Sequence, residues 1–137
     1  MSEGLTQFEM KLEVVPVPVS DVERALDFYV NKVGFNLDHD VVPSNGGPSP
    51  ELRVVQLTPH GSGCSIVIGK GMPEISDMVA GSVKALHLVV KDIEAVRNGL
   101  VERGVDVGAV EDHGRGVKYA RFEDPDGNSW LLQTLPY

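Results

Sequence analysis

The fold is decided by the stretch Val14-Val15-Pro16-Val17-Pro18-Val19-Ser20-Asp21-Val22-Glu23, because the chain repeats it as Ala85-Leu86-His87-Leu88-Val89-Val90-Lys91-Asp92-Ile93-Glu94. Each copy is a short apolar run followed by Asp, an apolar residue and Glu. The copies are 71 residues apart, and the offset becomes 70 at Gly34 and Gly104. An internal repeat of this kind predicts two copies of one supersecondary unit.

A helix is expected to follow the apolar run in each copy. In the first copy, Ser20 and Glu23 have the spacing of a capping box, and Gly34 suits the left-handed residue just past a helix end. In the second, Asp92 is the expected cap and Gly104 the end. The apolar positions at helical spacing are Val22, Ala25, Leu26, Tyr29 and Val33 in the first helix and Ile93, Val96 and Leu100 in the second.

Short strand-like segments follow each helix. We expect strands near residues 35–42, 51–58 and 64–69, and again near 105–110, 117–123 and 128–135. Turn residues lie at 45–48, 60–63 and 124–128. The predicted order is therefore βαβββ twice, with module one at about residues 10–69, a linker at about 70–82 and module two at about 83–135.

A four-stranded sheet with one helix has only one covered face. The other face must be buried against the second module, a partner chain or a ligand, so a duplicated open sheet predicts a cleft. Pro16 and Pro18 deny backbone donors to a neighbouring strand, which predicts that their strand lies at a sheet boundary.

Composition limits the protein classes that remain. The 137 residues suffice for one domain, residues 1–137, and are too few for two with separate cores. Hydrophobic residues at 42% and charged residues at 23% are typical of a globular domain. The net charge of -8 with scattered Lys and Arg disfavours nucleic-acid binding. The lone Cys64 excludes intramolecular disulfides and multi-cysteine zinc sites. No signal or membrane-spanning pattern is found, so a cytoplasmic protein without a membrane partner is expected.

Two motifs carry a resemblance to a known family. The run from Val17 to Tyr29 with Gly34-Phe35, and the turn Phe122-Glu123-Asp124-Pro125-Asp126-Gly127-Asn128, resemble the vicinal oxygen chelate superfamily. That superfamily includes glyoxalase I, bleomycin-resistance proteins, fosfomycin-resistance enzymes and extradiol dioxygenases. The resemblance covers roughly residues 10 to 135. It implies an α+β fold in which two βαβββ modules form a half-open barrel around a cleft, and it implies a homodimer.

The same resemblance implies where a metal would bind. Members of the superfamily often hold a divalent metal inside the barrel on His, Gln or Glu. Here the corresponding positions are Val14, Ala85 and Leu131, with the fourth within Ile66–Ile68. None of these side chains can ligate a metal, since such sites require imidazole, carboxylate, thiolate or amide oxygen. We therefore expect no metal and no other cofactor, and metal-dependent glyoxalase or dioxygenase activity is disfavoured.

Strand parity predicts which side chains line the cleft instead. Residues of the same parity as a ligand position point the same way. This groups His87 and Val89 with Ala85, Pro16 and Pro18 with Val14, and Gln133 and Ser129 with Leu131, while the family's inward positions add Tyr119 and Arg121. The expected pocket is mainly apolar, and the predicted ligand-binding residues are His87, Tyr119, Arg121, Gln133, Leu131, Val14, Pro16 and Ala85.

Each polar candidate has two interpretations. His87 is suited to acid–base catalysis, and the alternative is a histidine hydrogen-bonded within its sheet. Arg121 can hold a carboxylate, phenolate or carbonyl, or it can form an ion pair with Glu123 or Asp112. Tyr119 can stack on a flat ligand or serve packing alone.

Three further residues are interpreted as structural. Trp130 has the opposite parity to Leu131 and is expected to pack under a helix. Cys64 is expected in the core. His39, although flanked by two Asp residues, is interpreted as a solvated side chain.

Three hypotheses of function remain. The first is metal-independent binding of a small, partly apolar or aromatic molecule in the cleft, including sequestration of an antibiotic as in bleomycin-resistance proteins. The second is a metal-independent isomerase, cyclase or epimerase with His87 as general base and Arg121 or Tyr119 stabilising negative charge. The third is a scaffold whose cleft a partner chain fills.

Overall fold

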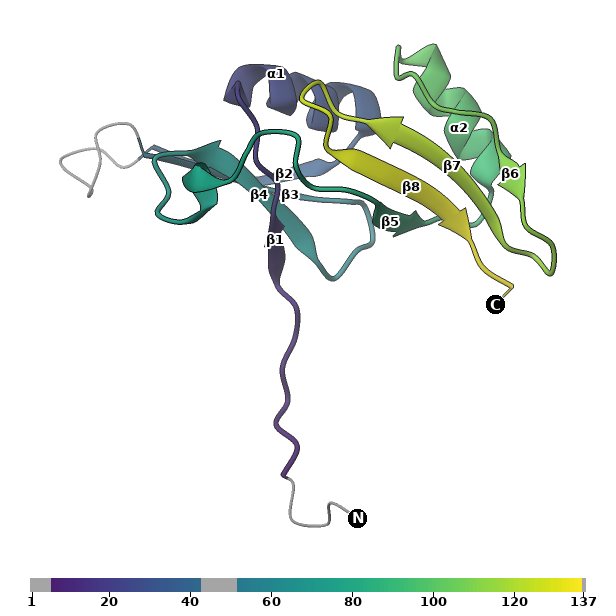
Figure 1. Ribbon diagram of the computed structural model, residues 1–137, viewed down its shortest axis with the longest axis horizontal. Helices are drawn as coiled ribbons and strands as arrows, with labels where there is room; N and C mark the ends of the chain where they lie inside the picture. Colours follow the sequence, from purple (N-terminus) through teal and green to yellow (C-terminus); the bar gives the residue numbers. More distant parts are fainter. Residues whose placement is uncertain (1–5, 43–51, 137) are drawn as a thin grey trace.

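The computed structural model describes residues 6–42 and 52–136. The predicted turn at 45–48 and the first residue of the strand expected at 51–58 lie outside this range. Two four-stranded sheets are present in the described chain (Figure 1). The N-terminal sheet has the order β1-β4-β3-β2, and the C-terminal sheet has the order β5-β8-β7-β6. The strands are β1 (Val14–Pro16), β2 (Asn36–Val41), β3 (Arg53–Thr58), β4 (Ser65–Lys70), β5 (Leu86–Val89), β6 (Glu111–Asp112), β7 (Lys118–Glu123) and β8 (Ser129–Thr134).

The two sheets have the same topology. In each, the first strand pairs in parallel with the last, and the remaining pairs are antiparallel. This confirms the predicted βαβββ repeat and the α+β class with a half-open arrangement. β1, which carries Pro16, is an edge strand, as the proline pattern predicts.

An Asp residue precedes each of the two long helical segments, and a Gly residue follows each of them. Helix α1 (Val22–Leu26) continues into a π-helix, Asp27–Val33, and α2 covers Ile93–Glu102. The Asp92 carboxylate accepts from the backbone N–H of Ala95 at 3.1 Å, as predicted. Gly34 and Gly104 have φ values of 94° and 90°, which confirms both as left-handed helix ends.

The capping box predicted at Ser20 and Glu23 is wrong. Asp21 is the N-cap, and its carboxylate accepts from the backbone N–H of Arg24 at 3.1 Å. Ser20 instead bonds Asp126 in the other module, where its backbone N–H and its hydroxyl donate to the two carboxylate oxygens at 3.0 and 2.5 Å. A long-range partner therefore replaces the local one.

The strand expected at 105–110 is not formed, and the short β6 lies just after it. Two backbone carbonyls of residues 105–110 accept from a side chain, because the Arg97 guanidinium donates to Gly108 O at 2.7 Å and to Val107 O at 3.1 Å. The Gly108 N–H makes one backbone bond to Arg121 O of β7 at 2.8 Å. Val105 and Val107 are buried in the core, each 3% exposed. The buried valines and the Arg97 hydrogen bonds therefore hold this segment in place without a strand ladder.

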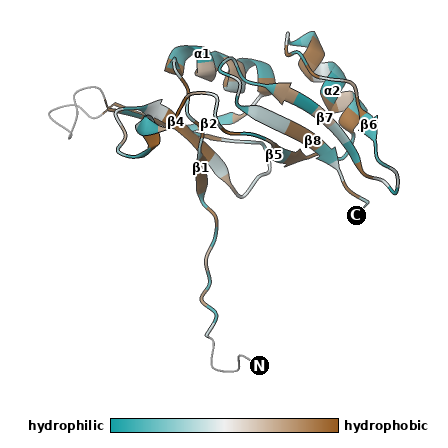
Figure 2. Ribbon diagram, in the orientation of Figure 1, coloured by the Kyte–Doolittle hydropathy of each residue, from teal (hydrophilic) through white to brown (hydrophobic). Residues whose placement is uncertain are grey.

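One core cluster includes side chains from both modules. Phe28 and Tyr29, from the π-helix, contact Phe122 and Trp130 of the C-terminal sheet with ring centroids 6.2 and 5.8 Å apart. Trp130 is therefore under a helix, as predicted. Both helices lie on the same side of the strands in Figure 1, and hydrophobic segments run through the strands beneath them in Figure 2. Within residues 6–42 and 52–136, neither α1 nor α2 covers the opposite face of the sheets.

A buried polar network joins the modules at the 124–128 turn. The Tyr29 hydroxyl donates to Asp124 at 2.7 Å and accepts from Trp130 Nε1 at 3.0 Å. The Asn128 amide donates to Asp124 at 2.7 Å and to the Pro18 carbonyl at 2.8 Å. Burial, and then the nearby Asp124 charge and its hydrogen bond, raise the pKa of the Tyr29 phenol far above its ordinary value.

Residues 6–13, here called the arm, extend away from the body of the molecule (Figure 1). The arm alternates polar residues with three exposed apolar ones, Phe8, Met10 and Leu12, which are 74%, 84% and 71% exposed. In the part of the chain that the structure describes, no helix is long and apolar enough to cross a membrane.

Candidate functional site

The uncovered face of the C-terminal sheet brings most of the predicted ligand-binding residues together. In one cross-strand row, His87 of β5 is in register with Leu131 of β8, which is in register with Arg121 of β7. In the next row, Gln133 lies between Val89 and Tyr119. We call these six residues, together with Ala85, the sheet face. The register therefore places side chains from three strands on one surface, as strand parity predicts.

The Tyr119 ring packs edge-on against two histidine rings. Its centroid is 6.1 Å from that of His87 and 5.1 Å from that of His113. The Gln133 amide donates to the Tyr119 hydroxyl at 3.1 Å. Histidine and tyrosine rings in this arrangement present apolar surface and polar atoms to the same space.

His87 also has a backbone partner. Its Nδ1 lies 2.8 Å from the carbonyl oxygen of Ala85, two residues earlier. Ala85 has a φ of 61°, in the left-handed region that residues other than glycine rarely adopt. Its backbone N–H donates to the buried Ser129 hydroxyl at 2.8 Å, which fixes this conformation.

Arg121 forms an ion pair with Glu123, one of the two interpretations left open by the sequence, at 2.5 Å between Nη2 and Oε2. Both side chains are about half exposed, so this pair contributes little stability. Arg121 also borders a hollow of about 540 Å³ whose other side chains are mostly carboxylates, those of Asp106, Glu111, Glu123 and Asp124. The guanidinium keeps further N–H donors beyond the one used by Glu123.

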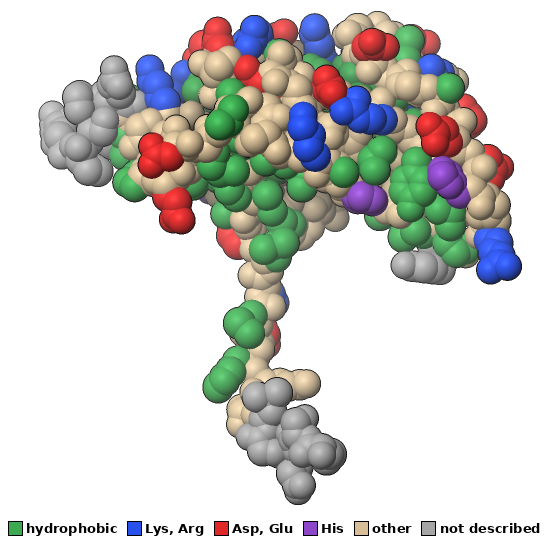
Figure 3. Space-filling view, viewed as in Figure 1, with side chains coloured by type: hydrophobic (Ala, Val, Ile, Leu, Met, Phe, Trp, Pro, Cys, Tyr) green, Lys and Arg blue, Asp and Glu red, His purple; other side chains and the backbone are tan. Residues whose placement is uncertain are grey.

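An apolar pocket lies next to the sheet face, at the junction of the two modules. We call it the junction pocket; its volume is about 200 Å³. His87 belongs both to its wall and to the sheet face. The other lining residues are Leu12, Val15, Pro59, Ser62, Cys64, Ser65, Ile66, Leu86, Leu88 and Trp130. In Figure 3 the underside of the molecule is indented between the arm and the C-terminal part, and hydrophobic side chains border the indentation.

Sequence reasoning missed most of this junction pocket. Val15, with the opposite parity to Val14 and Pro16, lines it, and Cys64 lines it rather than lying fully in the core. Val14 and Pro16 are in register with Ser65 and Val67 on the N-terminal sheet instead. Only the relative placement of the modules reveals the pocket, and no local pattern carries that information.

The residues at the superfamily's metal positions do not fit a metal. Val14, Ala85 and Leu131 offer only hydrocarbon side chains, and so do Ile66, Val67 and Ile68. Within residues 6–42 and 52–136, no three His, Cys, Asp or Glu side chains are grouped so that they could hold an ion. The chemistry of this donor set therefore supports no step through a bound metal.

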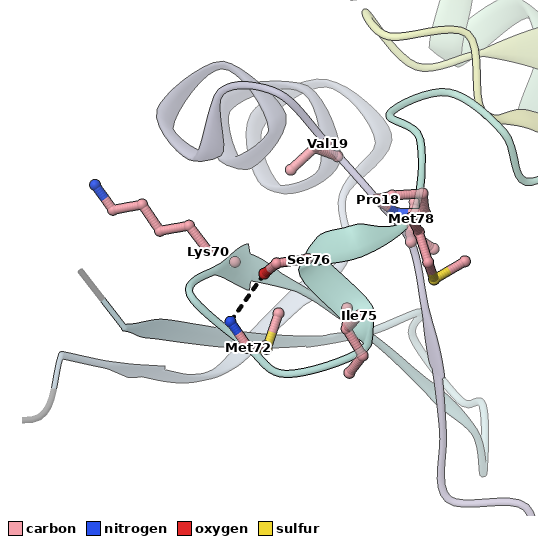
Figure 4. Close-up of a pocket in the computed structure, with 9 residues that line it drawn as sticks. Pro18, Val19, Lys70, Met72, Ile75, Ser76 and Met78 are labelled. Atoms are coloured by element: carbon pink, nitrogen blue, oxygen red, sulfur yellow. Dashed lines mark hydrogen bonds between the residues drawn. The ribbon is translucent and has the colours of Figure 1, made fainter. Parts of the chain in front are cut away.

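A second hollow lies by the short helical turn Ile75–Asp77 in the linker (Figure 4). It measures about 110 Å³ and is lined mainly by apolar side chains, among them Met72, Ile75 and Met78. The Met72 backbone N–H donates to the Ser76 hydroxyl at 2.8 Å, which closes the turn, and the Lys70 side chain extends away from the hollow (Figure 4). This volume is about half that of the junction pocket, and none of its lining residues belongs to the sheet face.

The family relationship follows from comparison with known proteins. Residues 11–132 match the family model described as the Glyoxalase/Bleomycin resistance protein/Dioxygenase superfamily. A relative from Shewanella frigidimarina, described as an uncharacterized protein, is 32% identical over 134 residues, covering 92% of this chain and 96% of that protein.

Two solved structures from Streptomyces sp. CB03234 are also similar. TnmS3, described as an antibiotic binding protein, is 34% identical with a TM-score of 0.76, and the match covers 94% of this chain and 98% of that one. A glyoxalase/bleomycin resistance protein is 37% identical with a TM-score of 0.72, covering 89% and 98%. This chain therefore belongs to the glyoxalase/bleomycin resistance protein/dioxygenase superfamily.

Proposed function

We propose that this protein binds a small, partly apolar or aromatic molecule on the sheet face and in the junction pocket, without a protein-bound metal. The observation that carries the proposal is the register of His87, Leu131 and Arg121 beside an apolar pocket that His87 also lines. Apolar walls with a few directed polar groups are the usual composition of small-molecule sites.

The comparison with TnmS3 supports a more specific form of the proposal. That protein is described as antibiotic binding, and its fold matches this chain over 94% of its length. Sequestration of an antibiotic in the same region would require no catalytic group, which agrees with hydrocarbon side chains at the superfamily's ligand positions. We therefore propose antibiotic sequestration as the physiological use of the site.

Calorimetric titration with 2-naphthol, a flat apolar probe with one polar group, tests the binding proposal. Protein treated with a chelator is expected to bind the probe, and the emission of Trp130, the only tryptophan, should change because this residue is among those that line the junction pocket. Replacing Leu131→Asn should weaken binding about tenfold through lost apolar contact. Val54→Asn, on the N-terminal sheet, is the matched control. Binding that appears only after metal is added would overturn the proposal.

A second candidate function is metal-independent acid–base catalysis by His87. The hydrogen bond from Nδ1 to the Ala85 carbonyl favours it, because such a bond orients an imidazole and leaves Nε2 to take a proton. In that case His87→Ala abolishes turnover and retains binding. Equal turnover of the wild-type and variant proteins would remove this candidate.

We also propose that the protein forms a homodimer. The arm exposes Phe8, Met10 and Leu12 on alternate residues, a pattern typical of a strand that buries one face. A second copy of this chain would cover these side chains. Sedimentation of a variant with Phe8→Glu and Met10→Glu should show monomers where the wild type shows dimers, with Glu9→Gln and Lys11→Gln as the matched control. A wild-type monomer at 100 times the assay concentration would refute the dimer.

A further inference from the structure

Ala85 is the unusual residue of the site. A left-handed φ of 61° at a residue with a side chain costs about 1 kcal/mol or more, so it persists only where neighbouring groups enforce it. The neighbours are present: the buried Ser129 hydroxyl accepts from Ala85 N–H at 2.8 Å, and the Ser129 N–H donates to Val83 O at 3.0 Å. The chain is thus clamped on both sides of Lys84.

These two hydrogen bonds fix the direction of the Ala85 carbonyl. The Ala85 oxygen lies 2.8 Å from His87 Nδ1. A carbonyl oxygen only accepts hydrogen bonds, so the proton of the neutral imidazole must be on Nδ1. The other ring nitrogen, Nε2, then carries a lone pair, and His87 is exposed on the sheet face, where a ligand can reach it.

Tyr119 can play the hydrogen-bonding role opposite to that of His87, because its hydroxyl can donate. Its hydroxyl oxygen accepts from the Gln133 amide at 3.1 Å, which leaves the hydroxyl hydrogen free to donate. The Tyr119 and His87 rings are neighbours, with centroids 6.1 Å apart. Neighbouring rings on an apolar and aromatic surface therefore carry an acceptor and a donor.

We propose that the strained Ala85 backbone fixes His87 as a hydrogen-bond acceptor, so that the sheet face selects hydroxyaromatic ligands: a ligand hydroxyl donates to His87 Nε2 and accepts from the Tyr119 hydroxyl. This inference rests on the proposed binding function and specifies its ligand class. Ala85 and Ser129 are positioning residues that act through His87.

The tautomer is measured first, without a ligand. Long-range nitrogen–proton NMR spectra of the full chain with labelled histidine, recorded with the imidazoles neutral, distinguish a proton on Nδ1 from one on Nε2. The His87 signals are assigned by their loss in His87→Gln. A proton on Nδ1 is expected, and a proton on Nε2 would overturn the inference whether or not any ligand binds.

Ligand selection is measured with 2-naphthol and 2-methoxynaphthalene, in which a methyl group replaces the hydroxyl hydrogen so that the oxygen can no longer donate. We expect 2-naphthol to bind wild-type protein about three- to tenfold more tightly, the contribution of one neutral hydrogen bond. His87→Phe should bring this ratio close to one, because the acceptor for the ligand hydroxyl is lost. Ser129→Ala should lower the ratio, whereas Ser76→Ala, which also removes a hydroxyl that accepts from a backbone N–H but lies in the linker turn, should not.

The outcomes separate the two proposals. Equal binding of both naphthalenes to the wild-type protein overturns the selection of hydroxyl ligands and leaves the binding function standing. If neither naphthalene binds, the proposed function fails for flat aromatic ligands and the selection fails with it, while the NMR result still decides the tautomer.

Discussion

Replacing Tyr29 by Phe removes one oxygen atom from the middle of the polar network that joins the modules. Tyr29 is fully buried, and its hydroxyl donates to Asp124 and accepts from Trp130 Nε1. A hydrogen bond to a charged group contributes about 1.5–3 kcal/mol, and a buried donor left without a partner costs about 1–3 kcal/mol. Since both losses share the same atom, we expect the free energy of unfolding to fall by about 3 kcal/mol.

Urea denaturation followed by far-ultraviolet circular dichroism measures this change, because the signal does not depend on the environment of Trp130. Tyr119→Phe is the matched control, since it makes the same chemical change on a partly exposed side chain whose hydroxyl is bonded to Gln133. The control should lose less than about 1 kcal/mol. A loss below about 1 kcal/mol for Tyr29→Phe would refute the assignment of the network as the link between the modules.

The same phenol predicts how stability depends on alkaline pH. Burial and the Asp124 charge raise the pKa of Tyr29, whereas the unfolded phenol ionises near pH 10. Above that pH the unfolded state binds fewer protons than the folded state, so stability falls, by up to about 1.4 kcal/mol for each pH unit from this group. Tyr29→Phe should give a shallower decline between pH 10 and about pH 11.5. An identical slope in both proteins would contradict the prediction.

Two further predictions concern the linker and the N-terminal sheet. A methyl group at Gly81 would lie 2.0 Å from the Asp126 carbonyl oxygen, whereas one at Gly127 meets nothing within 4 Å and adds only backbone strain, both having positive φ. Gly81→Ala should therefore lower the midpoint of urea unfolding clearly more than Gly127→Ala, and equal effects would be inconsistent with this close approach. The bidentate hydrogen bonds from Arg53 hold the pKa of Asp40 below its usual range, so Arg53→Leu should raise that pKa in a carboxyl carbon NMR titration, and an unchanged titration curve would exclude the contact.

Much of the fold could be predicted because the sequence contains two copies of the same strand–helix pattern. Asp92, Gly34 and Gly104 mark helix boundaries through local hydrogen bonding and backbone conformation, and these chemical preferences are readable in sequence. Ser20 misled the capping prediction because its hydroxyl has a partner 106 residues away. The strand expected at 105–110 failed because the Arg97 side chain satisfies the carbonyls that a ladder would have used.

The site was predictable in part because it depends on alternation along single strands. Alternation along a strand is local, so His87 and Val89 could be assigned to one face, and both are exposed, whereas Ala85 precedes β5 with a φ of 61° and is outside the alternation. The junction pocket depends on how two modules pack, which strand parity does not encode. The left-handed Ala85 was also beyond prediction, because alanine rarely adopts that conformation and only the tertiary contact with Ser129 stabilises it.

The most direct test of the binding account is a map of amide chemical-shift changes as 2-naphthol is added to isotopically labelled protein. The account predicts that the largest changes fall in β5, β7 and β8 and around the junction pocket, with β2 and the linker turn at Ile75–Asp77 nearly unaffected. Changes concentrated on β2 or that turn, with β5 and β8 unmoved, would contradict it.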